Sequence, residues 1–177
     1  MKRVELCEHQ PEWIQQAATV VAELQALPVL AAWPIEHIGS TAVPGLCAKP
    51  VLDLLLGLPD LRAAAAKLIA ALPPAGWQYR PEHEATLPER RYFTRPATPN
   101  CPRLHLHAAL QGGPLWRRHL AFRDALRQRP AWAAQYGALK RQLAQAQPLD
   151  GAAYTEAKGP FIRACLVELA ELDKPGG

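Results

Sequence analysis

The residues best suited to chemistry are a short glycine–serine loop and a lone carboxylate on the apolar run that follows it. Gly39 allows the backbone to approach a ligand closely, and the hydroxyl groups of Ser40 and Thr41 stand beside free peptide N–H groups. A loop of this composition is able to hold phosphate, with Lys49 as a mobile cation nearby. Asp53 stands among valine and leucine, where a buried carboxylate is costly unless it is paired or bound to a metal ion.

Each of these features also has a purely structural explanation. Most glycine–serine pairs are ordinary turns, and the single aspartate of the strand could pair with an arginine such as Arg91 or Arg103. The loop, the lysine and the isolated carboxylate lie within the segment 39–53, however. Their combination makes a functional site as good an explanation as a structural one.

A second candidate group lies on a run in which histidine alternates with leucine. His105 and His107 are two residues apart on a predicted strand, so their side chains are expected on the same face. This spacing suits two metal ligands, or one ligand and one group that transfers a proton. Together with Asp53 they would form a two-histidine, one-carboxylate metal site, and His37 is a further candidate ligand. The alternatives are hydrogen bonds across the sheet or contact with a substrate.

The elements that must position these residues follow from apolar spacing and from the 18 prolines. Asp60 is expected to cap a helix, and the residues after Gly113 are expected to form three more. The last of these is capped by Asp150 and interrupted at Gly159 and Pro160. The other expected elements are helices at 10–27 and 60–72 and strands at 35–38, 51–56, 77–80, 91–95 and 103–110.

This order of elements predicts an α+β fold, with a mixed sheet first and a helical bundle second. The length of 177 residues favours one domain over 1–177, with a sheet-containing core to about residue 112 and a helical part over about 113–172. No apolar run approaches the ~20 residues that cross a bilayer, and the N-terminal segment lacks a signal-peptide pattern. We therefore expect a soluble, cytoplasmic protein whose four scattered cysteines are free thiols.

The net charge of +4 hides a strongly basic segment. Residues 76–147 contain twelve lysines and arginines but only four acidic residues, a pattern that hints at an anionic partner. On charge alone, a solvated, arginine-rich surface is the better explanation. Arg123 and Arg127 lie one turn apart on a predicted helix beside Asp124, and this spacing favours an ordinary surface network of ion pairs.

Several motifs in order along the chain resemble the GrpB family, also called UPF0157, a branch of the nucleotidyltransferase superfamily. They are the segment 37–53, Arg-Tyr-Phe-Thr at 91–94, Arg-Leu-His-Leu-His at 103–107, Leu-Ala-Phe-Arg-Asp-Ala-Leu-Arg at 120–127, and the pairs Tyr136/Lys140 and Tyr154/Lys158. The resemblance implies a nucleotidyltransferase-type mixed sheet flanked by helices.

The resemblance also implies a glycine–serine loop followed by a strand with two acids, which hold divalent metal for attack on an α-phosphate. Gly39, Ser40 and Asp53 match that pattern. Leu55 occupies the position of the second acid and cannot bind a metal ion, so the usual two-metal mechanism is in doubt.

Three functions remain open on this basis. In the first, Asp53 and His107 are catalytic, Asp53 anchors Mg²⁺ or Mn²⁺, and a nucleotidyl group is transferred. The expected phosphate-binding residues are Gly39, Ser40, Thr41, Lys49, Arg91, Arg103 and Lys158. The second function is an inactive module that binds a nucleotide or RNA, and the third is a metal-dependent hydrolase that uses His105, His107 and Asp53. A nucleotide or other phosphorylated small molecule is the expected ligand, because the basic residues are not ranked along one helix and no aromatic platform for single strands is visible.

Overall fold

The computed structural model describes residues 5–146 and 151–172. Its sheet has five strands in the order β1-β2-β5-β4-β3. Strands β2 and β5 run parallel, whereas the other neighbouring strands are antiparallel. The expected α+β class with a mixed sheet is therefore confirmed. The strands are β1 (Ile35–Ile38), β2 (Val51–Leu58), β3 (Gln78–Tyr79), β4 (Arg90–Arg95) and β5 (Arg103–Leu110).

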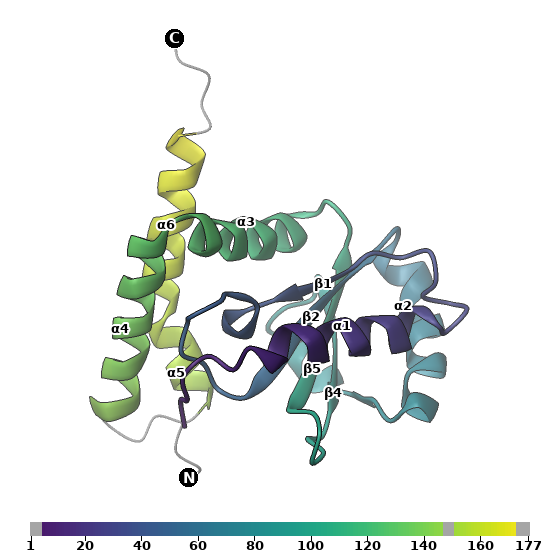
Figure 1. Ribbon diagram of the computed structural model, residues 1–177. Helices are drawn as coiled ribbons and strands as arrows, with labels where there is room; N and C mark the ends of the chain where they lie inside the picture. Colours follow the sequence, from purple (N-terminus) through teal and green to yellow (C-terminus); the bar gives the residue numbers. More distant parts are fainter. Residues whose placement is uncertain (1–4, 147–150, 173–177) are drawn as a thin grey trace.

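Helices before and after the sheet segment surround it (Figure 1). Asp60 caps its helix as expected, since its side chain accepts hydrogen bonds from the N–H groups of Arg62 and Ala63 at 2.7 and 2.9 Å. The expected interruption at Gly159 separates two helices. The helices of the described residues are α1 (Glu12–Gln25), α2 (Leu61–Ala71), α3 (Pro114–Gln128), α4 (Pro130–Ala146), α5 (Gly151–Ala157) and α6 (Gly159–Leu172), with short 3-10 turns η1 (Ser40–Ala42), η2 (Pro73–Ala75) and η3 (Pro81–His83).

One face of the sheet is apolar and is covered by α1 and α2. Alternate leucines of β2 and β5 and one phenylalanine of β4 point to this face, because side chains along a strand alternate between its two sides. Full burial of each leucine stabilises the fold by about 1.5–3 kcal/mol, so this layer anchors the sheet. The main buried members are Trp13, Val20, Leu24, Leu52, Leu54, Leu56, Leu68, Phe93, Leu104 and Leu106.

The opposite face has an apolar half and a polar half. Helix α3 covers the apolar half, where Leu115 and Trp116 pack against Ile38, Leu55 and Ala109. Leu55, at the position where the resemblance implies a second acid, is completely buried and thus belongs to the core. The polar half extends across β2, β5, β4 and β3.

Two arginines of α3 form hydrogen bonds to β1 and to the glycine–serine loop that follows it. Arg123 is only 9% exposed, and its guanidinium donates to Glu36 Oε2 at 2.7 Å and to the carbonyl oxygen of His37 at 3.0 Å. Arg127 Nε donates to the carbonyl oxygen of Ala42 at 2.9 Å. Arg123 and Arg127 pair with Asp124 at 2.7 and 3.7 Å, as the spacing predicted, but Arg123 is buried rather than at the surface, because this side of α3 faces β1.

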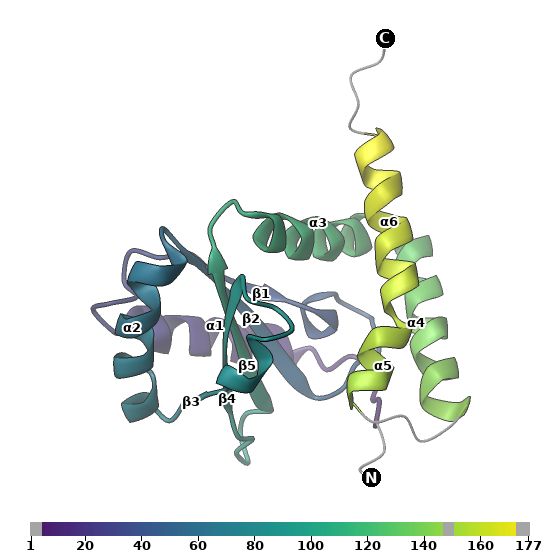
Figure 2. The same cartoon turned by 180° about the vertical axis from the view of Figure 1, so that it is seen from behind.

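Helices α4 and α6 stand side by side next to the sheet, and α3 connects the sheet to them (Figures 1 and 2). A third apolar cluster joins these helices to the loop between β1 and β2, through Val43, Leu46, Leu126 and Tyr136. The four cysteines are free thiols, as expected. Within the described ranges, no helix is both long and apolar enough to cross a membrane. The cap expected at Asp150 falls outside these ranges.

Replacement of Gly57 by alanine tests the packing of α3 on the sheet. A Cβ atom at Gly57 would lie 2.8 Å from the Trp116 ring and 3.0 Å from Pro34, and both rings are rigid neighbours. We expect Gly57→Ala to lower the free energy of unfolding by about 1–3 kcal/mol, measured by urea denaturation.

Gly137→Ala is the matched control for this substitution. Its Cβ atom would approach Leu46 and Arg141 only to 3.5 Å, and alanine favours a helix by up to about 1 kcal/mol over glycine. Gly137→Ala should therefore leave stability unchanged or raise it. Equal losses in the two variants would contradict the proposed packing.

Candidate functional site

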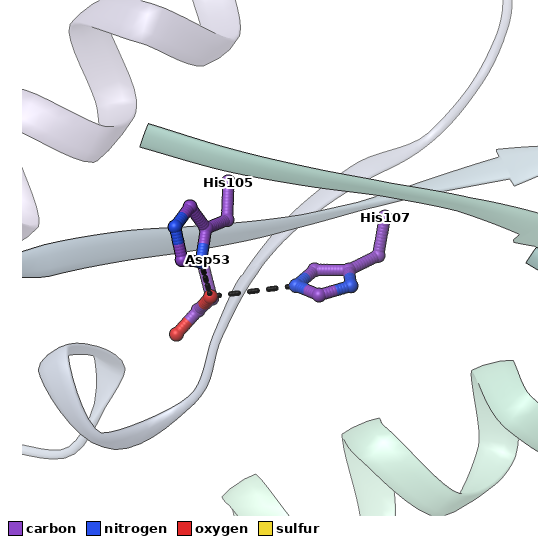
Figure 3. A group of neighbouring side chains, drawn as sticks. All are labelled: Asp53, His105 and His107. Atoms are coloured by element: carbon purple, nitrogen blue, oxygen red, sulfur yellow. Dashed lines mark hydrogen bonds and ion pairs between the residues drawn. The ribbon is translucent and has the colours of Figure 1, made fainter. Parts of the chain in front are cut away.

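Asp53 is the centre of the polar half of the sheet. The Nδ1 atom of His105 lies 3.2 Å and the Nε2 atom of His107 lies 3.4 Å from the same oxygen, Asp53 Oδ1 (Figure 3). Burial opposes ionisation of this carboxyl, but the hydrogen bonds from both imidazoles outweigh it and hold the pKa of Asp53 well below its usual range. Asp53 is therefore ionised at neutral pH and accepts both N–H groups.

Gly39 is required by its contact with this carboxylate. Its φ of 73° lies in the left-handed region that favours glycine, and a Cβ atom there would lie 2.7 Å from Asp53 Oδ2. The loop backbone thus lies directly against the oxygen that the histidines leave free. Ser40 follows it, half-buried, and its hydroxyl makes no hydrogen bond to another described residue.

Arg90 determines which nitrogen of His107 carries the proton. Arg90 Nη1 lies 3.1 Å from His107 Nδ1, and a guanidinium only donates hydrogen bonds, so Nδ1 accepts and the proton is on Nε2. Burial lowers the pKa of His107, which keeps the ring neutral despite the nearby Asp53. His107 is therefore an N–H donor to Asp53, with both ring nitrogens engaged.

Thr41 and His37 have structural partners and lie apart from this cluster. Thr41 is 1% exposed and donates its hydroxyl proton to the carbonyl oxygen of Val51 at 3.1 Å, so it accepts from His37 Nε2 at 2.9 Å. His37 pairs in register with Leu54, which places it on the leucine face of the sheet, opposite Asp53. Burial lowers the pKa of His37 to about 4.

Lys49 and Lys158 meet on one aromatic ring. Each ammonium group lies 4.5 Å from the centroid of Tyr154, on α5. Burial, and then the charge of Lys49, lower the pKa of Lys158 to about 8, while Asp53 opposes the shift. Burial also lowers the pKa of Lys49, again against the effect of Asp53. Among residues 5–146 and 151–172, neither lysine has a carboxylate within ion-pair distance, so the two cations form an anion-attracting pair near Asp53.

The two arginines expected to bind phosphate lie in different places. Arg91 is on the leucine face, where Nη1 lies 3.4 Å from Glu84 and donates to the carbonyl oxygen of Pro88 at 3.0 Å. Arg103 lies on the same face as Asp53, at the start of β5, with no hydrogen-bond partner among the described residues. The structure thus brings Arg103 to the polar half and keeps Arg91 away from it.

Three residues that sequence reasoning missed complete the cluster. Arg90 lies over the ring of Tyr92 at 4.6 Å, and the Tyr92 ring lies 5.0 Å from that of His107. His119 of α3 lies 5.9 Å from His107, and burial lowers its pKa to about 3. Helical spacing gives one signal, because His119 shares a face of α3 with Trp116, three residues earlier. A second signal is the position of Tyr92 next to the buried Phe93, which places the tyrosine on the opposite face of the strand.

The donor set only partly fits a divalent cation. Asp53, His105 and His107 offer three donor atoms that lie within 4.8 Å of one another. Two imidazoles and one carboxylate suit Mn²⁺ better than Mg²⁺, which prefers oxygen ligands. His107, however, receives a hydrogen bond at Nδ1, where a metal-bound imidazole normally donates one. Asp53 fits a cation as it stands, and His105 would fit one once its Nδ1 gives up the proton donated to Asp53, whereas Arg90 holds His107 in the unsuitable tautomer.

Relatives share this chain's sequence over most of its length. A UPF0157 protein of Pseudomonas aeruginosa is 35% identical over 164 residues, which are 90% of this chain and 65% of that protein. The chain thus spans less than two thirds of that relative. A dephospho-CoA kinase of Mycolicibacterium paratuberculosis is 30% identical over 182 residues, which cover 90% of this chain but only 44% of the kinase.

Solved structures share its fold. The crystal structure of conserved protein GrpB from Enterococcus faecalis matches with a TM-score of 0.76 and 35% identity, covering 93% of this chain and 96% of that one. The non-canonical poly(A) polymerase complex GLD-2–GLD-3 matches with a TM-score of 0.55 over 81% of this chain and 48% of that one. At 12% identity this second likeness concerns the fold alone, which is of the nucleotidyltransferase type.

The family model described as "GrpB protein" matches residues 3–168. The expected resemblance is confirmed along almost the whole chain, including the loop at Gly39, the strand of Asp53 and the His-Leu-His strand. The chain belongs to the GrpB family.

Proposed function

We propose that this protein binds a nucleoside triphosphate beside Asp53 and transfers its nucleotidyl group to an acceptor. The observation that carries the proposal is the pair of unneutralised lysines, Lys49 and Lys158, on the ring of Tyr154. The fold shared with a poly(A) polymerase complex supports a nucleotide as the ligand class. The ionised Asp53 offers an oxygen ligand for the divalent cation that would neutralise the reacting phosphate.

The triphosphate chain would relieve an electrostatic conflict between the lysines. The charge of Lys49 lowers the proton affinity of Lys158, and phosphate oxygens would accept charge-assisted hydrogen bonds from both. The Tyr154 hydroxyl is a further donor in this region, since the residue is 1% exposed and the hydroxyl has no partner within the described residues. Ser40 offers its unpaired hydroxyl from the loop.

At the reacting phosphate, Asp53 and His105 are the residues that would hold Mn²⁺ or Mg²⁺. Such an ion, when bound, neutralises the phosphate charge that would otherwise repel the carboxylate. A pair of metal ions is not part of the proposal, because Leu55 is buried in the core. His107 instead holds the Asp53 carboxylate in place through its N–H group.

An inactive nucleotide-binding module is the second candidate function, favoured by the missing acid at Leu55. A metal-dependent hydrolase is less consistent with the geometry, since Arg90 and Asp53 occupy both ring nitrogens of His107. A P-loop kinase activity like that of the dephospho-CoA kinase relative is not proposed. The sequence contains no G-x-x-x-x-G-K-[ST] segment.

Lys158→Met tests the phosphate site. We expect the variant to bind ATP about tenfold more weakly than the wild type in calorimetric titrations with Mn²⁺ present, because one charge-assisted hydrogen bond is lost. Lys67→Met, on the exposed side of α2, is the charge-matched control and should bind normally. CTP, UTP and dephospho-CoA are titrated in the same way. Release of pyrophosphate in the presence of an acceptor distinguishes a transferase from an inactive module. Unchanged ATP binding by Lys158→Met would refute the site.

The affinity for ATP should also fall with rising pH. The pKa of Lys158 is about 8, so its ammonium form, which binds phosphate, is present below that pH and is lost above it. Titrations at pH 7 and pH 9 should show weaker binding at pH 9. Lys158→Met should lack most of this pH dependence. A steeper dependence in Lys158→Met than in the wild type would contradict the assignment to this lysine.

Arg90→Gln should bind Mn²⁺ about tenfold more tightly than the wild type. Without the guanidinium, the Nδ1 atom of His107 is free to carry the proton and donate it to the glutamine oxygen, which frees Nε2 for the metal ion. Arg103→Gln removes the same charge from the same sheet face and is the control. Nitrogen-15 NMR of the imidazoles reports the tautomer directly. Equal tightening in both variants would mean that the effect is one of charge alone.

A further inference from the structure

We infer that the polar half of the sheet carries a second phosphate subsite, which binds a phosphate group of the acceptor. A hollow of about 130 Å³ lies on this face, lined by Gln78, Arg80, Thr94, Arg95, Pro96 and Arg103. The inference rests on the proposed transfer reaction, since it names what the nucleotidyl group is transferred to. The subsite lies on a part of the sheet that the proposed triphosphate site does not include.

The strand register places the hollow in line with Asp53. Asp53 pairs with His105, His105 with Thr94, and Thr94 with Gln78, so these residues form one row across four strands. Neighbouring strands are about 4.8 Å apart, so Thr94 lies about 10 Å from Asp53 along the row. An acceptor whose phosphate occupies the hollow would extend toward Asp53 over the ring of His105.

The hollow offers hydrogen-bond donors and no carboxylate. The side chains of Gln78, Thr94 and Arg103 make no hydrogen bond to another residue of the described ranges. Within the described part of the chain, Arg80 pairs with Glu82 alone, and the two side chains are 42% and 52% exposed, so this ion pair is weak and exchangeable. The guanidinium of Arg95 donates to Glu23, and the register with Leu104 places this side chain on the leucine face, so it is not one of the donors of the hollow.

These groups are suited to donate hydrogen bonds to the oxygens of one phosphate group. A guanidinium presents parallel donors to two oxygens, and the threonine hydroxyl and glutamine amide add two more. The hollow has room for a phosphate group, and its donors would recognise the backbone or phosphoester of the acceptor.

The subsite is separate from the lysine pair. Lys49 and Lys158 meet at Tyr154 on α5, whereas the hollow is built by β3, β4 and β5. Both ribbon views place α5 and β4 on opposite sides of β2, which carries Asp53 (Figures 1 and 2). The triphosphate of one substrate and the phosphate of the acceptor would therefore lie on either side of Asp53, each bound by its own basic residues.

The test is calorimetric titration of the full chain with AMP and with a short oligoadenylate, alongside ATP. We expect Arg103→Gln to weaken binding of the phosphorylated acceptor probe about tenfold while ATP affinity stays unchanged. Arg62→Gln, which removes an exposed arginine of α2, is the control and should alter neither.

The outcomes separate this inference from the proposed function. An Arg103 effect on AMP alone supports a small phosphorylated acceptor, and an effect on the oligonucleotide supports an RNA end. If ATP fails to bind the wild type while the Arg103 effect persists, the transfer proposal falls and the phosphate subsite stands. Absence of binding by both acceptor probes, or an equal loss in Arg62→Gln, overturns the subsite.

Discussion

The ionised carboxylate of Asp53 imposes the main electrostatic constraint on this fold, because a charge on a strand whose other side chains are apolar has to be solvated largely by the protein itself. Two imidazole N–H groups meet one of its oxygens, and the backbone of Gly39 lies against the other. This arrangement sets the residue type at position 39 and the proton position on His107. An apolar residue at 53 would leave those donors without an acceptor.

The remaining layers keep this group accessible on one side. Helices α1 and α2 bury the leucine face, which supplies most of the apolar stabilisation, so the opposite face does not have to be covered completely. Helix α3 covers only the half around Leu55, and its Arg123 fixes β1 at the entrance to the glycine loop. The polar half is thereby left to Asp53 and the polar side chains around it.

The GrpB chain keeps the loop and first acid of the nucleotidyltransferase pattern but changes its surroundings. Leu55 replaces the second acid, and the residue paired with it in register is His107, a neutral donor beside Asp53. Positive charge comes from Lys49, Lys158 and Arg90. Under the proposed function, fixed protein cations and N–H groups would thus supply part of the charge stabilisation that a second metal ion gives in a two-metal site.

Local sequence pattern alone determined a large part of this architecture. The histidine–leucine alternation predicted that His105 and His107 share a face, the turn at Gly39 was found, and the cap at Asp60 was correct, because strand alternation and capping depend on neighbouring residues. The tertiary structure decided the rest. Strand register joined Asp53 to the histidines and sent His37 and Arg91 to the other face, and helix packing buried Arg123. Register and packing depend on residues far apart in the chain, so no local spacing encodes them.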